Sequence, residues 1–450
     1  MLHLLISAAG IFLTILFVVG THESGHFLAA RAVGVKVLTF SIGFGKTLFS
    51  WRDKSGTEYV FALIPLGGYV RMLDESEATV AETELHRAYN KQPFYKKFII
   101  VAAGPFTNFV CAFLLYWLIL TMGYFTVKPI VGQVTPESIA ATAGMKPLQE
   151  ITRIDQQNVK TWTNVLFRLL AHTGSKDTLT IDVSDTTNQQ QKNLTLDLAG
   201  WKMDKLNPNP LLSLGIVPYE PPLKLEIGFI AKDSAAEKAT LAIGDKLIAI
   251  DHTNIKDWPA LIKTVQTHPD QTVLFTIIRD GKTLQIPVAL GSKRNWLMQK
   301  SGLLGIAPSV HMPEAYQQKV QYSFLDAIPQ AYQETYDLAK FNLLLFGKLL
   351  TGKLSLKSLG GPIFDTAGDS LNYGFLPFIS FLAFLSIAIG IINILPIPGL
   401  DGGHLLIQTI EAITRRAIPD NIVMLMYRVG FLFIMFIMAQ AVFNDVLRLM

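Results

Sequence analysis

Residues 4–26 read LLISAAGIFLTILFVVGTHESGH, and this stretch decides how the rest of the chain is interpreted. From Leu4 to Gly20 there is no charged side chain, and the run is long enough for most of a membrane crossing. The rival interpretation is a cleaved signal peptide. It is disfavoured because no basic segment precedes the run, and the first Lys or Arg is Arg31, after it. We therefore predict a transmembrane helix.

The composition supports a membrane protein. Of the 450 residues, 50% are hydrophobic and 16% are charged, whereas soluble domains carry about 25% charged residues. Further uncharged runs at 98–127, 370–400 and 429–444 make four crossings the simplest count. A net charge of +4 spread over this length gives no basic stripe, so nucleic acid is not an expected partner. Cys111 is the single cysteine, so no internal disulfide can form.

The basic residues predict the orientation of these crossings. Lysines and arginines in short loops stay on the cytoplasmic side of a membrane. Ten of them lie between residues 31 and 97, and three more lie at 415, 416 and 428. Both segments are therefore expected inside. Both termini and the insert 126–369 are then expected outside, which in a bacterium is the periplasmic face of the inner membrane.

The insert contains an internal repeat with a period of 96 residues. Val131-Gly132, Ile154-Asp155 and Trp162 align with Ile227-Gly228, Ile250-Asp251 and Trp258. The alternating segment 275–279 predicts a strand, with Asp280-Gly281 turning a hairpin. The pattern resembles PDZ domains, most clearly in the second copy, which has Gly244-Asp245. The first copy has Leu148-Gln149 instead. The alternative is a duplicated β-domain that acts as a spacer.

The chemistry is predicted at His22-Glu23-Ser24-Gly25-His26. Histidines four apart on a helix share one face and can bind one metal ion, and Glu23 then lies beside the metal-bound water. A chance match is the alternative. It is disfavoured because ionisable groups in a membrane helix cost roughly 2.5 to 3.5 kcal/mol each and are normally there for function.

A third metal ligand is expected at Asp401, the acidic residue that adjoins the third apolar block. A catalytic zinc ion takes three protein ligands and leaves the fourth position to water. The segment NILPIPGLDGGH, residues 393–404, carries prolines and glycines that break a helix at membrane depth. A helix cap is the alternative for Asp401. For His404, a position beside the metal ligands without binding the metal, or a merely structural role, is favoured.

These motifs together resemble the site-2 protease family. HExGH on a first transmembrane helix, a distant NxxPxPxLDGG and PDZ domains between helices two and three all correspond to it, and the match covers essentially the whole chain. Within the family, Gly43-Phe44-Gly45-Lys46 and Gly104-Pro105 with Asn108 are similar to the bacterial proteases that regulate sigma-E. One departure is Ala388, where many relatives have Asn.

The resemblance implies roles for individual residues. It assigns His22, His26 and Asp401 to one zinc ion per chain, Glu23 to the general base, and Asn393 to the substrate backbone or oxyanion. It also implies that the apolar segment from Glu58 to Leu73 is a re-entrant β-hairpin that accepts an extended substrate strand. A cytoplasmic hairpin that touches the membrane is the alternative. The further substrate contacts that it implies are Gly67, Gly68, Tyr69, Pro396 and Pro398.

The expected fold is a multi-pass α-helical membrane protein with four transmembrane helices, a re-entrant β-hairpin and two tandem periplasmic PDZ-like α+β domains. The expected segments are residues 1–125 with helices one and two, 126–221 and 222–310 with the two PDZ-like domains, 311–369 with an amphipathic periplasmic connector, and 370–450 with helices three and four. The active site is then expected near the cytoplasmic side of the lipid bilayer.

The expected function is metal-assisted hydrolysis of peptide bonds inside the membrane. The resemblance implies a single-pass membrane protein as substrate, namely an anti-sigma factor already shortened outside by another protease, and also remnant signal peptides. Two alternatives remain open on the sequence. One is a non-enzymatic PDZ scaffold with structural zinc. The other is a metal transporter, which would require several polar helices.

Overall fold

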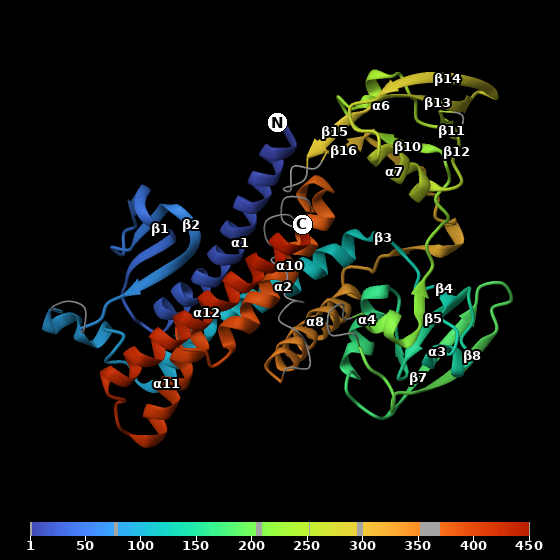
Figure 1. Cartoon of the computed structure of the whole chain (residues 1–450). Helices are drawn as coiled ribbons and strands as arrows, with labels where there is room; N and C mark the ends of the chain where they lie inside the picture. Colours follow the sequence, from blue (N-terminus) through green and yellow to red (C-terminus); the bar gives the residue numbers. More distant parts are fainter. Residues whose placement is uncertain are drawn as a thin grey trace.

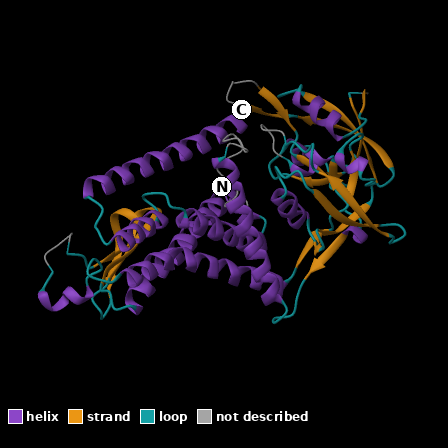
Figure 2. Cartoon of the chain, turned by 90° about the horizontal axis from the view of Figure 1, so that it is seen from below, coloured by secondary structure: helices purple, strands orange, loops and turns teal. Residues whose placement is uncertain are grey.

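The computed structural model describes residues 2–75, 80–203, 209–251, 253–294, 300–351 and 370–449. Long helices form one part of the molecule, and two β-rich units lie together on one side of them (Figure 1). The strands of a separate hairpin lie on the opposite side of the helices. Seen from below, the C-terminal helix runs apart from the others (Figure 2).

Three helices among the described residues are long and apolar enough to cross a membrane. They are α1 (Leu2–Ala32), α2 (Phe94–Met122) and α10 (Phe375–Ile394). α2 packs against both α1 and α10 and is therefore the centre of this group. The expected fourth crossing falls in α12 (Asp420–Leu449), whose apolar stretch at Asn421–Ile437 is shorter. The fourth crossing stays a prediction.

The third membrane helix stops where the prolines predict. α10 ends at Ile394, and the chain then runs irregularly through two prolines and Gly399, which has a φ of +98°. α11 (Asp401–Thr414) begins directly afterwards. Proline removes a backbone donor and clashes with the preceding turn, which explains the break.

The hairpin is a curled sheet made of β1 (Val37–Arg52) and β2 (Glu58–Met72). Both strands bend. Residues 39–42 of β1 pair with residues 58–61 of β2 on one side and with residues 68–71 on the other. Residues 47–52 of β1 continue the sheet beyond residues 58–62. The sheet therefore has two free edges, one at residues 68–72 and one at residues 47–52.

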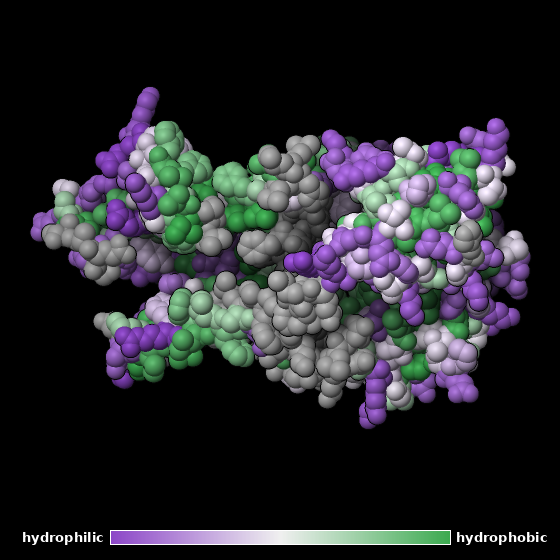
Figure 3. Space-filling model, turned by 45° about the horizontal axis from the view of Figure 1, so that its top comes forward, coloured by the Kyte–Doolittle hydropathy of each residue, from purple (hydrophilic) through white to green (hydrophobic). Residues whose placement is uncertain are grey.

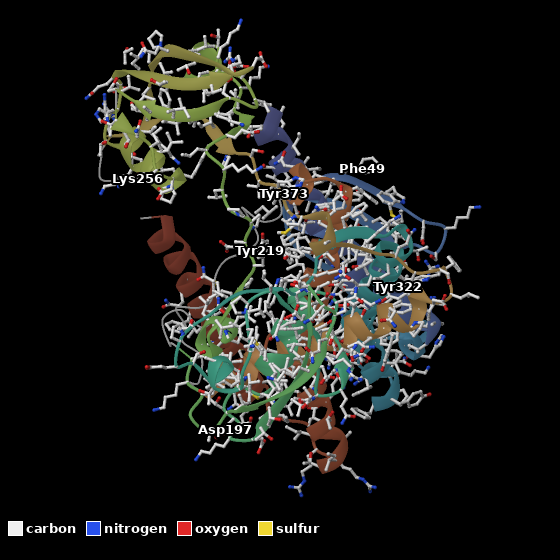
Figure 4. The ribbon with its side chains drawn as sticks, turned by 90° about the vertical axis from the view of Figure 1, so that its right-hand side faces the viewer. Phe49, Asp197, Tyr219, Lys256, Tyr322 and Tyr373 are labelled. Carbon is white, nitrogen blue, oxygen red and sulfur yellow. The ribbon has the colours of Figure 1, made fainter. Side chains whose placement is uncertain are left out.

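The two β-rich units have the same topology, as the repeat predicts. Their four-stranded sheets have the orders β6-β5-β7-β8 and β12-β11-β13-β14, and a two-stranded sheet joins the ends of each unit, β4-β9 and β10-β17. Asp280 and Gly281 turn the hairpin between β13 and β14 with φ of +49° and +75°, as a type I′ turn requires. In Figure 4, Asp197 lies on the first unit, Lys256 on the second, and Tyr219 on the chain between them.

The elements of the first unit are β4 (Val131–Val134), α3 (Ile139–Thr142), β5 (Gln149–Ile154), β6 (Gln157–Asn158), α4 (Trp162–Ala171), β7 (Thr178–Asp185), β8 (Gln191–Asp197), α5 (Pro210–Leu214) and β9 (Ile216–Pro218). Those of the second are β10 (Ile227–Ile230), α6 (Ala235–Lys238), β11 (Lys246–Ile250), β12 (Thr253–Asn254), α7 (Trp258–Gln266), β13 (Thr272–Arg279), β14 (Lys282–Ala289), β15 (Gly291–Arg294), β16 (Lys300–Leu303) and β17 (Ile306–Pro308).

Each unit has its own apolar core. In Figure 3 the surface of the two units is largely hydrophilic, whereas green hydrophobic side chains lie over the helices and the hairpin. The two units therefore have the surface of water-exposed domains. Charged and polar side chains would be costly in lipid.

A two-stranded ribbon connects the first β-rich unit to the helices. β3 (Tyr124–Val127) pairs with β18 (Gln317–Val320), so the boundary expected at residue 126 falls inside a strand that pairs outside the first unit. After β18 comes α8 (Ala327–Leu350), which packs against α2, α10 and α4. α8 lies within the segment 311–369 that was expected to be an amphipathic connector, and residues 352–369 of that segment lie outside the described residues. The short helices at Glu82–Arg87 and Glu314–Tyr316 complete the described elements.

Candidate active site

The C-terminal third of α1 carries the two histidines of the motif. His22 and His26 are four residues apart on this helix, so their side chains project from one face. Both side chains are nearly buried, and their Nε2 atoms lie 3.3 Å apart. The structure thus brings together the two ring nitrogens that the spacing predicts.

Asp401, at the start of α11, completes a cluster with these rings. Its Oδ2 atom lies 3.1 Å from Nε2 of His22 and 3.3 Å from Nε2 of His26. The two residues after it, Gly402 and Gly403, allow this approach, because a Cβ at either position would overlap carbonyl oxygens of the irregular segment before α11. The LDGG pattern therefore has a steric reason.

The cluster fits a tetrahedral zinc ion. Its three candidate ligand atoms form a triangle with edges of 3.1, 3.3 and 3.3 Å. Zinc bound to nitrogen and oxygen at about 2.0 to 2.1 Å in tetrahedral geometry would separate its ligand atoms by roughly 3.4 Å. In addition, Oδ2 of Asp401 is buried without a hydrogen-bond partner among the described residues. A bare buried carboxylate oxygen is costly, and a metal ion would satisfy it.

Neighbouring groups on α2 hold the two imidazoles in place. Nδ1 of His26 donates to the carbonyl of Ile100 at 2.8 Å, which leaves its Nε2 lone pair directed at the cluster. The side-chain amide nitrogen of Asn108 lies 3.4 Å from Nδ1 of His22. Gly104 lies directly against the rings, because a Cβ there would overlap His26. α2 thus fixes the orientation of both rings.

A cavity of about 370 Å³ opens beside the cluster. Residues of α1, the hairpin, α10 and the segment at the start of α11 line it. The residues that line it are Val18, Val19, His22, Glu23, Phe44, Gly67, Gly68, Ile389, Asn393, Gly399, Leu400, Asp401 and His404. Two of the three candidate ligands, His22 and Asp401, thus line the same space as the Glu23 carboxyl group and the Asn393 side-chain amide, and His26 lies directly behind them in the cluster.

Two predicted catalytic residues lie in this cavity. Glu23 lines it between the two histidines of the motif. Asn393 lines it from the end of α10, with its amide nitrogen 3.5 Å from Nε2 of His22. Ile389 faces the same space, whereas Ala388 does not line it.

Some of the residues that were expected to contact the substrate line this cavity, and others do not. Gly67 and Gly68 line the cavity, whereas Tyr69, Pro396 and Pro398 do not. Gly68 sits close to α1, because a Cβ there would lie 2.8 Å from Cγ of Glu23. The free edge of the hairpin at residues 68–72 therefore begins beside the candidate catalytic carboxyl.

Sequence reasoning missed several residues of the site. The carbonyl of Ile100 is a backbone group, so the residue type at position 100 gives no indication that this carbonyl accepts the hydrogen bond from His26. Gly104 and Asn108 appeared only as part of a resemblance, although a glycine inside a membrane helix is itself a sign of close packing. His404, expected beside the metal ligands or in a structural role, lines the cavity, and its Nδ1 atom lies 3.1 Å from the Tyr427 hydroxyl.

Fold and site together define a membrane metallopeptidase. The family model described as "Peptidase family M50" matches residues 10–437, so the chain belongs to this family, the site-2 proteases. It is 37% identical over 435 residues to a "Putative zinc metalloprotease" of Vibrio cholerae, with 96% of both chains covered. It is 36% identical over 452 residues to the "Regulator of sigma-E protease RseP" of Salmonella typhimurium, with 100% of both covered. With the relative of that name in Escherichia coli it shares 37% over 447 residues, which cover 99% of this chain and 98% of the relative. The chain is a site-2 type zinc metalloprotease.

Proposed function

We propose that this protein is an intramembrane zinc endopeptidase that hydrolyses peptide bonds in the transmembrane segment of single-pass membrane proteins. The observation that carries the proposal is the triangle of His22, His26 and Asp401 beside a cavity that contains Glu23. Family membership sets aside the scaffold and the metal transporter, because both alternatives lack a hydrolytic role.

His22, His26 and Asp401 would hold the zinc ion, which when bound supplies a Lewis acid and lowers the pKa of a water molecule toward 7. Glu23 accepts the proton of the attacking water at its carboxylate and then gives it to the leaving amine. The amide of Asn393 donates a hydrogen bond to the oxyanion that develops on the substrate carbonyl.

The hairpin has a distinct part in this mechanism. A helical peptide hides its amides in internal hydrogen bonds, so the substrate must be extended before hydrolysis. The free edge at residues 68–72 pairs with the unwound substrate by strand addition. This edge begins at Gly68, next to Glu23, so a strand added there would place its backbone at the cavity.

We further propose the architecture that the sequence indicates. α12 is the fourth crossing, the two β-rich units are PDZ-like domains at 126–221 and 222–310, and both they and the termini lie in the periplasm of a bacterial inner membrane. The names of two relatives contain sigma-E. We therefore propose that the substrate is an anti-sigma factor cut first outside the membrane, whose cleavage releases sigma-E, and that remnant signal peptides are also cleaved.

Incubating the purified full-length protein in detergent with a transmembrane peptide tests this function. We expect cleavage that a zinc chelator stops and added zinc restores. Glu23→Gln should reduce the rate by at least about 100-fold while zinc stays bound, because an amide cannot accept the proton. Exposed Glu220→Gln, far along the chain, is the matched control and should cleave normally. Retention of more than about one hundredth of the activity by Glu23→Gln would exclude the general-base role.

A further inference from the structure

A second cavity, of about 870 Å³, lies away from the candidate active site. It is bounded by the last turns of α2, the first turns of α10, one side of α8 and the start of α4 in the first β-rich unit. It shares no lining residue with the catalytic cavity. Its volume is in the range of ligand sites, about 300 to 1,000 Å³.

The lining of this cavity is mainly apolar where the membrane helices form it. α2 contributes Ile119 and Leu120, and α10 contributes Leu376, Pro377 and Phe384. Both helices are candidate membrane spans, so these side chains lie at the level where acyl chains of lipid are available.

A smaller hollow of about 200 Å³ adjoins the large cavity and is polar. The two share Leu120, Tyr124, Thr161 and Glu334. The residues found only in the smaller one are Asn158, Lys160, Asn164, Arg168, Val320, Tyr322, Gln330, Gln333 and Asp337. Tyr322 lies on the segment that precedes α8 (Figure 4). The two hollows therefore adjoin at these shared residues, and together they give a space with an apolar part and a polar part.

The charges of the polar part are balanced. Two cations, Lys160 and Arg168, face two carboxylates, Glu334 and Asp337. Arg168 pairs with Asp337 at 3.0 Å, and Lys160 donates to the hydroxyl of Tyr322 at 2.6 Å. A space with this balance does not favour a ligand of net negative charge.

Glu334 lies where the two parts of the space meet. It accepts a hydrogen bond from the Asn164 amide at 3.3 Å, and no lysine or arginine in the described part of the chain is within ion-pairing distance of it. A largely enclosed carboxylate without a cationic partner is costly. A ligand ammonium group at this point would remove that cost.

We propose that this space binds one phospholipid with a zwitterionic, ammonium-bearing headgroup, of the phosphatidylethanolamine class. The acyl chains occupy the apolar part between α2 and α10, the phosphate lies in the polar part, and the headgroup folds back so that its ammonium group reaches Glu334 at the junction. The phosphate is near Lys160, whose Nζ retains donors beyond the bond to Tyr322. The lipid would then fill the junction between the first β-rich unit and the membrane helices.

Native mass spectrometry of the full-length protein in detergent tests the proposal with lipids of identical acyl chains. We expect phosphatidylethanolamine to bind at least about 10-fold more tightly than phosphatidylglycerol. Free phosphoethanolamine, which lacks acyl chains, should bind far more weakly. Equal affinity for the two lipids would overturn the proposal, and so would tight binding of the headgroup alone or displacement of the lipid by a transmembrane substrate peptide.

Variants separate the two parts of the space. Glu334→Gln keeps the shape and should abolish the preference between the two lipids. Ser380→Phe, which fills the apolar part, should reduce binding of both lipids at least about 10-fold. Leu118→Phe, on the exposed side of α2, is the matched control and should bind like the wild type. If Ser380→Phe does not fold, Glu334→Gln still decides, because a variant that keeps the full preference refutes the headgroup site.

Discussion

Gly104→Ala should weaken zinc binding although the residue contributes no ligand atom. The Cβ added to this position would overlap the His26 ring and would lie 2.9 Å from Cε1 of His22. Carbon atoms in contact are normally about 3.5 to 4.0 Å apart. The rings or α2 must therefore move by at least roughly 0.6 Å.

The cluster does not tolerate such a shift. Ligand distances at a metal site are normally within about 0.2 Å of their ideal values, and the three atoms here form a triangle with edges of 3.1 to 3.3 Å. Changes in residues that orient ligands typically cost 10-fold to 100-fold in metal affinity. We expect a loss of at least about 10-fold for Gly104→Ala, with a parallel loss of peptidase activity.

The assay is zinc content after dialysis against buffers of fixed free zinc concentration, measured by elemental mass spectrometry alongside thermal unfolding. Gly347→Ala on α8 is the matched control, because a Cβ at that glycine meets nothing within 4 Å. If Gly104→Ala folds and binds zinc with the wild-type affinity, the argument that α2 positions the imidazoles is refuted.

Three further predictions concern the other parts of the chain. In the second β-rich unit, burial alone would raise the pKa of Asp245, but hydrogen bonds from Arg279 and the Ala242 amide outweigh it and hold the pKa below its usual range. The stability that the ionised Asp245 contributes is present above about pH 4 and is lost as pH falls through the lowered pKa. Thermal unfolding should therefore show that Asp245→Asn costs about 2 kcal/mol at pH 7 and much less at pH 2. An equal cost at both pH values would contradict a stabilising role of the Asp245 charge. If the two β-rich units exclude substrates with bulky outer domains by size, deleting residues 129–308 and bridging the ends with a flexible linker should keep zinc bound but permit cleavage of intact substrates that the wild type rejects. Ile227→Asp in the second unit should have a smaller effect than the deletion. Continued rejection of intact substrates by a zinc-bound deletion variant would refute exclusion by size. Replacing a helix-loosening glycine or proline in the substrate by leucine should slow cleavage, measured as an initial rate, and unchanged rates would argue against strand addition at residues 68–72.

The membrane helices and the metal cluster were predictable because their signals are local. An uncharged run predicts α1, and a spacing of four on a helix predicts that His22 and His26 share a face. Asp401 was predictable because it is the acidic residue next to a broken apolar helix. These inferences use only the hydrophobic effect, helix geometry and the conformation of proline.

Contacts between distant segments were not predictable in this way. β3 and β18 pair although both β-rich units lie between them in the sequence, and nothing in their four-residue sequences marks one as the partner of the other. The pairing of residues 39–42 with both ends of β2 depends on how the hairpin bends. The backbone carbonyl of Ile100 is chemically the same as that of any other residue. Such contacts depend on packing rather than on the type of residue.

The most direct test of intramembrane hydrolysis is to identify the bond that is cleaved. The wild-type protein would be reconstituted in liposomes with a single-pass substrate in water labelled with ¹⁸O, and both products would be analysed by mass spectrometry. We predict that the new carboxyl group carries one labelled oxygen and lies within the substrate's bilayer-spanning segment, and that neither product forms with Glu23→Gln. Cleavage confined to the water-exposed parts of the substrate, or products that form equally with Glu23→Gln, would contradict the mechanism.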